Sequence, residues 1–539
     1  NKIILDDKLG NIATNNARQI YNKVGGINIF QNDDAGLQLN IGGRGLNPSR
    51  SANFNTRQNN YDISADVLGY PESYYTPPAE ALREIQIVRG AASLQYGTQF
   101  GGLVNFVFKE PDIYRKLKIS SSNTLGSNSL YTNFTSFSGV LNKIGYYSFI
   151  NYKKGDGFRP NSNFESINLY SYVDYKLSKK IKMSFEITFL HYLAQQPGGL
   201  TDQMFLTNPF QSNRERNWFK VNWLLYNYKL LYEINKESKL SVSFFGLDAY
   251  RFALGFRDNR VDQVDPLNER DLIKGKFNNY GVETRFLTKY SFFNKRSVFL
   301  TGLKYYKSKN ISEQGPGSSN SGPDFSYYYN LYPNYVNQSY YEYPNLNYAL
   351  FAENIFYLDS TFSITPGLRY ENINTESNGY YKSISLNLAQ QPIFDSTYFS
   401  QDSYQRKFIL FGSGFSYKPK QSFEIYANIS QNYRSVTFAD ISIKSPSFVI
   451  NADIKDEDGY TYDIGFRGSF NNYIRYDINY FGLSYNNRIG FIQKAIEISP
   501  GYSVVKTERS NVGDAFINGF ESILDFRLKD FFITNLHAN

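Results

Sequence analysis

The chain has 539 residues, 18% of them aromatic, with a mean hydropathy of −0.47 and a formal net charge of +8. It contains no cysteine and only His191 and His537 as histidines, which excludes a disulfide framework, a thiolate metal site and a multi-histidine zinc site. No stretch approaches the roughly 20 consecutive apolar residues of a spanning helix, so a helical membrane protein is excluded and a β-barrel is not.

The aromatic residues are mainly 48 Tyr and 45 Phe, more than a soluble core of this size needs. Tyrosine combines an apolar ring with a polar tip, which suits a surface where hydrocarbon meets water. The charge reflects 57 basic against 49 acidic side chains. This excess is too small to indicate a nucleic-acid partner.

Residues 1–111 show mixed helical and strand patterns. Ala17, Ile20, Tyr21 and Val24 have the spacing of a short amphipathic helix. Strands are predicted over residues 27–30, 37–45 and 85–88, with a short helix near residues 79–82. We therefore expect a small α/β domain over residues 1–111.

The segment "VRGAASLQYGTQFGGLVNFVFKEP", residues 88–111, is a predicted strand interrupted by glycines and followed by a second strand. Glycine permits positive φ and close approach of another backbone. We expect tight turns here that pack against a neighbouring surface.

After residue 111 the pattern becomes a repeated alternation. In "YIRYDINYFG" the apolar residues from Ile474 to Tyr480 alternate with polar residues, and "KMSFEITF" shows the same pattern. Period two with one apolar face is typical of half-buried strands. The sequence contains seventeen or eighteen such segments.

The connections between these strands alternate in length. Tight turns such as "LSKKIK", "LDSTF", "YKPKQSF" and "SFNNY" alternate with long polar stretches near residues 194–216, 255–276, 311–340, 377–404 and 435–459. Short turns on one rim and long loops on the other are typical of a transmembrane barrel. The alternative, a soluble sandwich or propeller, has shorter strands and loops that do not sort by length.

These observations predict a mainly β protein, an antiparallel transmembrane β-barrel over residues 112–539. A barrel with this many strands leaves an open lumen, and large outer-membrane transporters carry a plug there. We expect residues 1–111 to be that plug domain.

Three segments carry a family resemblance: "RGAASLQYG", "GGLVN" and "LNIGGRG". They resemble the plug signature of TonB-dependent outer-membrane receptors. Further segments resemble the ferric-citrate class within that family: "NFNTRQNNYDISADVLGYPESYYTPPAEALREIQIVRG", "YLAQQPGGLTDQMF", "SNRERNWFKV", "LFAENIF", "ITPGLRYE" and "SQNYR".

The resemblance implies a protein of the bacterial outer membrane that is not an enzyme. Such a receptor binds a ferric chelate, here ferric citrate, and imports it into the periplasm with energy from the inner-membrane TonB complex. Its partners are the chelate, TonB and outer-membrane lipid, and it has no resident cofactor because iron arrives already coordinated. The alternatives are a receptor of the same type for another siderophore or nutrient, and more remotely a passive porin or an adhesin barrel.

Arginine is the expected partner of an anionic chelate, because its planar guanidinium pairs bidentately with carboxylates. The candidate ligand-binding residues lie in polar segments, and the alternative for each arginine is a solvated loop charge. They are Arg50, Arg57, Gln58, Arg214, Arg216 and Arg434, with Arg257 and Arg260 as weaker candidates. Tyr74 and Tyr75 either line the same pocket or pack against the barrel.

The resemblance also implies an ionic contact between plug and barrel. Arg44 and Arg89, in glycine-flanked turns, would pair with Asp463 and Glu521 on barrel strands. Alternation with Tyr462 points Asp463 into the lumen, but it is one methylene shorter than the glutamate usual in the family. The alternative is that both carboxylates only line a wet lumen.

No metal site is predicted. The acidic run "DIKDEDG", residues 453–459, does not place its oxygen ligands at the alternating positions of a calcium loop. A solvated acidic loop is the favoured interpretation.

The strand count also leads to an expectation about the barrel wall. Plugged transporters close with about 22 strands. We expect about four further strands at the C-terminus, and a first barrel strand, near residues 116–123, that lacks its closing neighbour. The alternative is a smaller barrel that closes with sixteen or eighteen strands.

Overall fold

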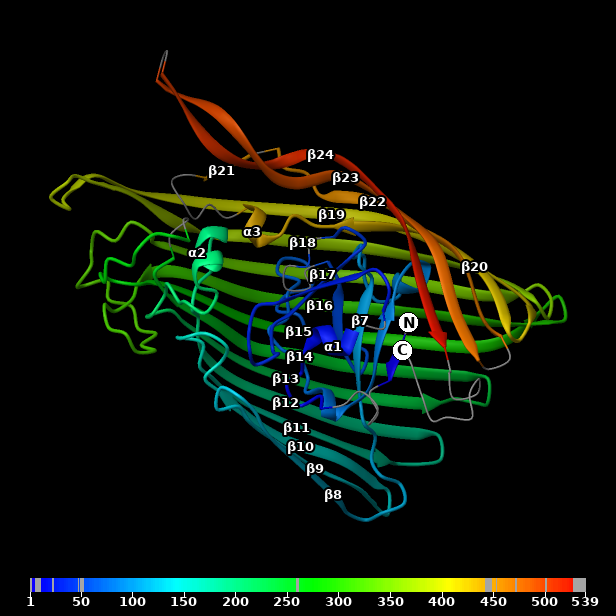
Figure 1. The fold of residues 1–539 in the computed structure, drawn as a ribbon. Helices are drawn as coiled ribbons and strands as arrows, with labels where there is room; N and C mark the ends of the chain where they lie inside the picture. The colour runs from blue at the N-terminus through cyan, green and yellow to red at the C-terminus, as the bar shows by residue number, and fades with distance from the viewer. Residues whose placement is uncertain are drawn as a thin grey trace.

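The computed structural model describes residues 2–4, 11–21, 24–46, 48, 53–257, 261–441, 448–451, 453–470, 473–499 and 502–526. A small N-terminal unit lies against a curved wall of long antiparallel strands (Figure 1). Within the described residues, no helix has the length and apolarity to cross a membrane.

The N-terminal unit contains two small sheets. A five-stranded sheet has the order β1-β6-β7-β4-β5, and β2 pairs with β3 as a separate hairpin. The elements are β1 (Lys2–Ile4), α1 (Ala17–Tyr21), β2 (Ile27–Gln31), β3 (Leu39–Gly43), β4 (Asn55–Gln58), β5 (Tyr61–Asp62), η3 (Ala79–Ala81), β6 (Leu82–Val88), η4 (Ala91–Ser93) and β7 (Leu103–Phe108). The predicted first helix is present, and the residue-111 boundary falls after β7.

Glycines shape the segment between β6 and β7. Gly90 has φ 70° and Gly102 has φ 83°, both in the left-handed region that favours glycine. A Cβ atom at Gly102 would collide with the carbonyl oxygen of Val88, and one at Gly90 would collide with the side chain of Asn428 on the wall. The tight turns and close approach expected here are therefore present.

The wall contains seventeen strands in the described residues, within the predicted range. They are β8 (Lys118–Leu125), β9 (Tyr131–Leu141), β10 (Ile144–Gly155), β11 (Phe164–Lys176), β12 (Ile181–Gln195), β13 (Trp218–Glu233), β14 (Ser238–Gly255), β15 (Asp271–Phe292), β16 (Lys295–Pro316), β17 (Ser339–Tyr357), β18 (Phe362–Leu386), β19 (Pro392–Lys420), β20 (Phe423–Arg434), β21 (Phe448–Ile450), β22 (Glu457–Phe470), β23 (Ile474–Ser499) and β24 (Tyr502–Phe526). Helices α2 (Asp202–Thr207) and α3 (Phe438–Ile441) lie in connections between strands.

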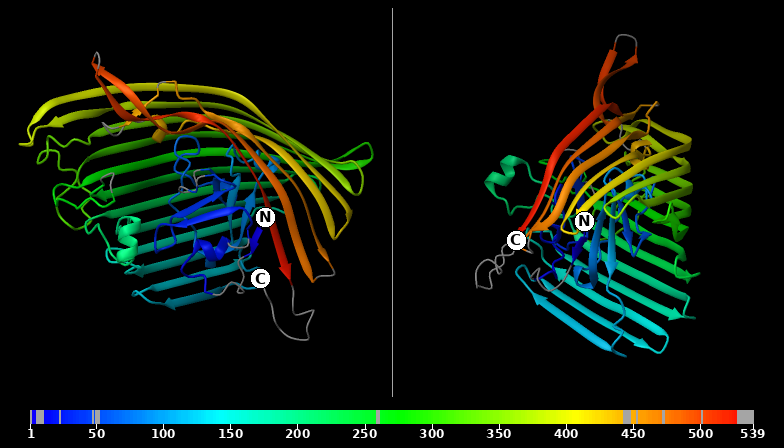
Figure 2. Two further views of the ribbon diagram at one scale, coloured as in Figure 1. Left: turned by 45° about the horizontal axis from the view of Figure 1, so that its top comes forward. Right: turned by 90° about the vertical axis from the view of Figure 1, so that its right-hand side faces the viewer.

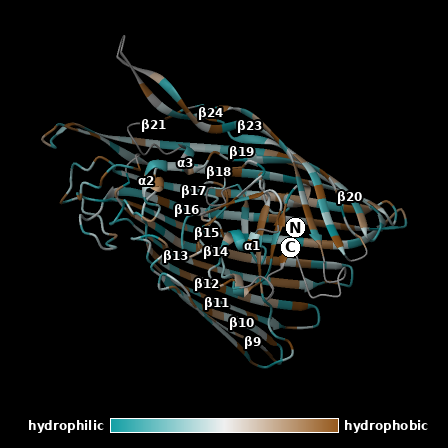
Figure 3. Ribbon diagram, viewed as in Figure 1, coloured by the Kyte–Doolittle hydropathy of each residue, from teal (hydrophilic) through white to brown (hydrophobic). Residues whose placement is uncertain are grey.

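Alternation along the strands separates two faces of the wall. On β13, Trp223 and Leu225 are buried on the face that meets the plug, whereas Tyr226 on the opposite face is 37% exposed. Apolar and polar residues alternate along most wall strands (Figure 3). The exposed apolar face is the one that suits lipid.

The connections sort by length as predicted, with one correction. Short turns follow β11, β17, β19 and β22, and long connections follow β12, β14, β16 and β20. The predicted long loop over residues 377–404 is wrong, because β18 and β19 continue through it and only residues 387–391 connect them. Cross-strand ring pairs such as Tyr381 with Tyr398, 5.3 Å between centroids, stabilise this hairpin.

The strand order is that of a closed barrel in which β24 and β8 stand next to each other. Among the described residues, pairing registers run from β8 to β20 and on through β22 and β23 to β24, but none of these registers joins β24 to β8. The expectation of about four further strands stays a prediction.

Candidate functional site

The N-terminal unit lies in the hollow of the wall (Figure 2). Many of the contacts between the two are polar and buried. On β12, for example, Glu186 accepts a hydrogen bond from Asn59 of the N-terminal unit at 2.7 Å. Two clusters of charged residues on different parts of the wall hold this unit in place.

The first cluster joins the four residues that the resemblance implied. Arg44 donates to both carboxylate oxygens of Glu521, at 3.0 and 3.1 Å, and also pairs with Asp463. Arg89 contacts Glu521 at 3.4 Å. Burial lowers the pKa of Arg89 to about 10, helped by the neighbouring Arg44, so Arg89 stays protonated at neutral pH.

Asp463 pairs with one of the two arginines of this cluster. Asp463 pairs with Arg44 and accepts a hydrogen bond from Asn479 at 3.2 Å. Among the described residues, Arg89 makes its ion pair with Glu521 rather than with Asp463. Arg44 has φ 55°, a left-handed conformation that is costly for a residue with a Cβ atom and that this cluster stabilises.

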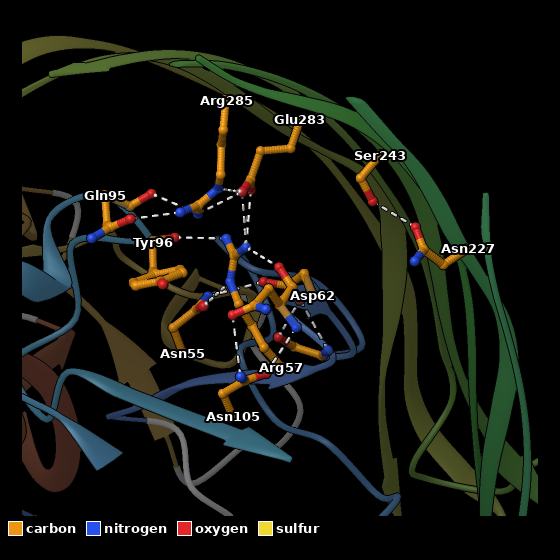
Figure 4. A network of polar contacts seen from close by, with 12 residues as sticks. Asn55, Arg57, Asp62, Gln95, Tyr96, Asn105, Asn227, Ser243, Glu283 and Arg285 are labelled. Atoms are coloured by element: carbon orange, nitrogen blue, oxygen red, sulfur yellow. Dashed lines mark hydrogen bonds and ion pairs between the residues drawn. The ribbon is translucent and has the colours of Figure 1, made fainter. Parts of the chain in front are cut away.

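The second cluster is centred on Glu283 of β15 (Figure 4). Arg57 of β4 donates to its two carboxylate oxygens at 3.0 and 3.2 Å, and Arg285 donates through Nε at 2.8 Å. Arg57 has no solvent exposure, and its other donors bind Asn55 at 2.6 Å and backbone carbonyls. The carboxylate therefore neutralises one arginine from the plug and one from the wall.

Three arginines bind consecutive carbonyl oxygens of the glycine-rich segment. Arg369 of β18 donates to the Leu94 oxygen at 3.0 Å. Arg285 donates to the Gln95 oxygen at 3.3 Å, and Arg57 to the Tyr96 oxygen at 2.9 Å. Two of the three arginines belong to the wall, so residues 94–96 are clamped to it.

Sequence reasoning missed the wall residues of this second cluster. Glu283 and Arg285 stand two residues apart on β15, and Arg369 and Glu371 stand two residues apart on β18, paired at 2.6 Å. Residues two apart face the same side of a strand. Two opposite charges at that spacing on the lumen face of a strand are the sequence signal that would have predicted these contacts with the plug.

The predicted ligand residues Arg57 and Gln58 are both fully buried. Gln58 donates to Tyr61 at 2.8 Å and to Thr188 of β12 at 3.0 Å. Both side chains therefore form hydrogen bonds within the plug and with the wall. Arg50 and Arg260 lie outside the described residues.

Arg214 and Arg216 connect long loops to one another. Arg214 donates to the Gln263 carbonyl at 2.9 Å, and Arg216 pairs with Asp265 and donates to the Ser319 carbonyl at 2.7 Å. Both side chains are buried. They hold the loops after β12, β14 and β16 together.

Tyr74 and Tyr75 are also buried, so packing is the role the structure shows for them. The ring of Tyr74 lies 5.8 Å from Phe219 and 5.9 Å from Trp223 of β13. Its hydroxyl lies 2.6 Å from that of Tyr70. This contact fixes the plug loop that faces the long-loop side of the wall.

Among the predicted ligand residues, Arg434 lines a cavity. It ends β20, pairs with Glu457 and Asp440, and borders a cavity of about 240 Å³ between plug and wall. Arg488 and Arg509 line the same cavity. Sequence reasoning missed these two, which lie within long strands and carry no turn signal.

A register shift brings Arg488 into this cavity. The pairing of β23 with β24 slips on both sides of this residue, which marks a β-bulge. Bulges redirect a side chain out of the regular alternation. Arg488 is exposed and makes no ion pair with any described carboxylate, whereas Arg509 pairs with Asp440.

The sequence profile of a family described as "TonB dependent receptor-like, beta-barrel" matches residues 158–539, more than half of the chain. The chain belongs to this family. TonB-dependent receptors of this kind are outer-membrane proteins and are receptors or transporters rather than enzymes. The plug-like N-terminal unit and the barrel wall form the fold of such a receptor.

Solved structures support the fold of this TonB-dependent receptor. The ferric citrate transporter FecA in its unliganded form has a TM-score of 0.77 and 17% identity, over 99% of this chain and 75% of that chain. The ferric-catecholate import receptor Fiu from E. coli K12 has a TM-score of 0.71 and 12% identity, over 98% and 77%. The alcaligin receptor FauA from Bordetella pertussis has a TM-score of 0.64 and 13% identity, over 96% and 74%. No curated protein matches the sequence.

Proposed function

We propose that this receptor imports an anionic ferric chelate, with ferric citrate as the leading candidate, using energy from the inner-membrane TonB complex. The observation that carries the proposal is the plug, which lies in the hollow of the wall and is bound to it by two buried ionic clusters. Such a plug closes a passive route, so import requires work to move it. Ferric citrate comes from the name of one structural relative and from the sequence segments that resemble its class.

The cavity beside Arg488 is lined by three arginines and two glutamates, Glu72 and Glu457, and its arginines suit an anionic ligand. Carboxylates hold Arg434 and Arg509 in place, and their side chains are 19% and 20% exposed. Arg488 adds a cation without a described carboxylate partner. Guanidinium groups bind carboxylates through two parallel hydrogen bonds, which is the chemistry a citrate complex offers.

The energy requirement is tested by uptake of radiolabelled ferric citrate into cells that carry the receptor. We expect uptake to stop when the proton gradient is collapsed, because the plug then stays in place. Uptake that continues at the same rate would refute active import. Competition with an excess of a ferric catecholate tests the substrate. We expect the uptake of radiolabelled ferric citrate to be unaffected, and loss of that uptake would indicate that the receptor prefers catecholates.

The cavity is tested by Arg488→Ala. Loss of one hydrogen-bonded charge should weaken chelate binding roughly 10- to 150-fold. Arg296→Ala is the matched control, because Arg296 is an exposed arginine at the start of β16, next to the short turn after β15. Equal affinity of the Arg488 and Arg296 variants would place the binding site elsewhere.

A further inference from the structure

The outer face of β15, β16 and β17 carries a belt of tyrosine rings. Tyr280 lies 6.3 Å from Tyr305, and Tyr305 lies 5.4 Å from Tyr348, between ring centroids. On the short-turn side of these rings, Leu303 and Leu350 are 52% and 48% exposed. Tyrosine belts of this kind lie at the boundary between hydrocarbon and lipid headgroups.

Three lysines follow on the long-loop side of this belt. Lys276, Lys307 and Lys309 are exposed on the outer face, whereas their neighbours Phe277 and Tyr306 are buried on the inner face. Long loops mark the external rim of a barrel. The lysines therefore lie at the level of the outer-leaflet headgroups.

The strand registers bring the three lysines together. Lys307 pairs with Tyr280, Lys309 pairs with Asn278, and Lys276 pairs with Ile311. Lys276 is thus diagonal to Lys309, a spacing of about 7–8 Å, and Lys307 lies two residues from Lys309 on the same face.

The acidic groups near this lysine triplet neutralise only part of it. Lys309 pairs with Glu342 of β17 at 2.8 Å. Glu313 stands opposite Lys274, and Asp248 of β14 stands opposite Asn278. Lys276 and Lys307 make no ion pair with the described residues. Like charges this close on a sheet repel each other, so the site favours an added anion.

Two further lysines on the outer face are covered by aromatic rings. The Lys274 ammonium lies 4.2 Å from the ring centre of Tyr327, and the Lys220 ammonium lies 5.8 Å from that of Phe325. Both rings belong to the loop after β16. The loop after β16 therefore covers Lys274 and Lys220. It leaves Lys276, Lys307 and Lys309 exposed beside the tyrosine belt.

We propose that Lys276, Lys307 and Lys309 bind the phosphate groups of an anionic lipid in the outer leaflet. Lysine ammonium groups bind phosphate as point charges, and basic clusters next to a membrane bind anionic headgroups. The depth of the triplet, directly above a tyrosine belt, favours a lipid over a soluble partner. The proposal does not depend on the substrate of the receptor.

The test uses the purified receptor in a neutral detergent, titrated with bisphosphorylated lipid A and with enzymatically dephosphorylated lipid A. The variant is K276Q/K307Q/K309Q, and the matched control is K176Q/K179Q/K236Q, three exposed lysines on the short-turn side. Bound lipid is counted by native mass spectrometry, and circular dichroism checks the fold.

We expect the triplet variant to bind phosphorylated lipid at least about 10-fold more weakly, because it loses three charges at the headgroup, while the control variant binds normally. Dephosphorylated lipid should bind all forms equally and weakly. Equal binding of phosphorylated lipid to the triplet and control variants would overturn the proposal. Displacement of the lipid by an equal concentration of inorganic phosphate would overturn it as well, because the site would then not select a lipid.

Discussion

Glu283→Gln is the substitution expected to loosen the plug most at the second cluster. Glu283 accepts hydrogen bonds from Arg57 and Arg285, whose side chains are 0% and 17% exposed. Glutamine keeps the size of the side chain and removes its charge. Both guanidinium groups would then be left in a buried site without a neutralising carboxylate.

The expected magnitude follows from that burial. Removing one partner of a buried ion pair costs about 3–5 kcal/mol. This corresponds to roughly two to three and a half orders of magnitude in the equilibrium between docked and released plug. With a urea dependence of about 1–3 kcal/mol/M, the midpoint of plug release should fall by at least about 1 M.

Plug release is measured as the appearance of ionic conductance through single receptors in a planar bilayer during a urea titration. Glu353→Gln is the matched control, because Glu353 lines the cavity near Arg44 and is attracted to Arg285 without forming an ion pair with it. The reasoning is refuted if Glu283→Gln leaves the midpoint unchanged, or if Glu353→Gln lowers it by the same amount.

Other substitutions test neighbouring parts of the argument. Glu521→Gln should lower the conductance midpoint more than Asp463→Asn, because Glu521 binds two arginines; equal shifts would contradict this. Gly102→Ala should expose the plug to protease, since φ is 83° and the new Cβ meets a carbonyl, whereas Gly322→Ala, with no atom within 4 Å, should not. Arg216→Ala should speed proteolysis of the loop after β14; unchanged cleavage would argue against its connecting role.

The alternation of residues was enough to predict the wall and the direction of single side chains. Asp463 was expected to point into the lumen because it alternates with Tyr462. In the structure Asp463 is 4% exposed and its neighbour Ile464 is 55% exposed on the outer face. Period two is a local property of the chain, so it needs no knowledge of the partner strand.

Pairing between strands could not be predicted in the same way. Residues 377–404 contain many polar residues and were expected to form a loop, yet they form the end of a hairpin. What stabilises that hairpin is contact between residues such as Tyr380 and Phe399, 5.9 Å apart, which are distant in sequence. The Arg57–Glu283 ion pair could not be predicted for the same reason, because its two residues are 226 positions apart in the sequence.

The roles of the arginines were the hardest to predict from the sequence. Composition cannot distinguish an arginine that binds a ligand from one that binds the backbone carbonyls of a loop. A guanidinium has five N–H donors. Arg270 directs its donors to the carbonyls of Ser318, Arg216 and Gly322 and to the Ser318 hydroxyl, so the loops already use it. Arg488 lies at an irregularity within a strand, where regular pairing does not fix the side chain and no described carboxylate neutralises it. An arginine at a bulge on the lumen face is therefore a stronger candidate for ligand binding than an arginine in a polar loop.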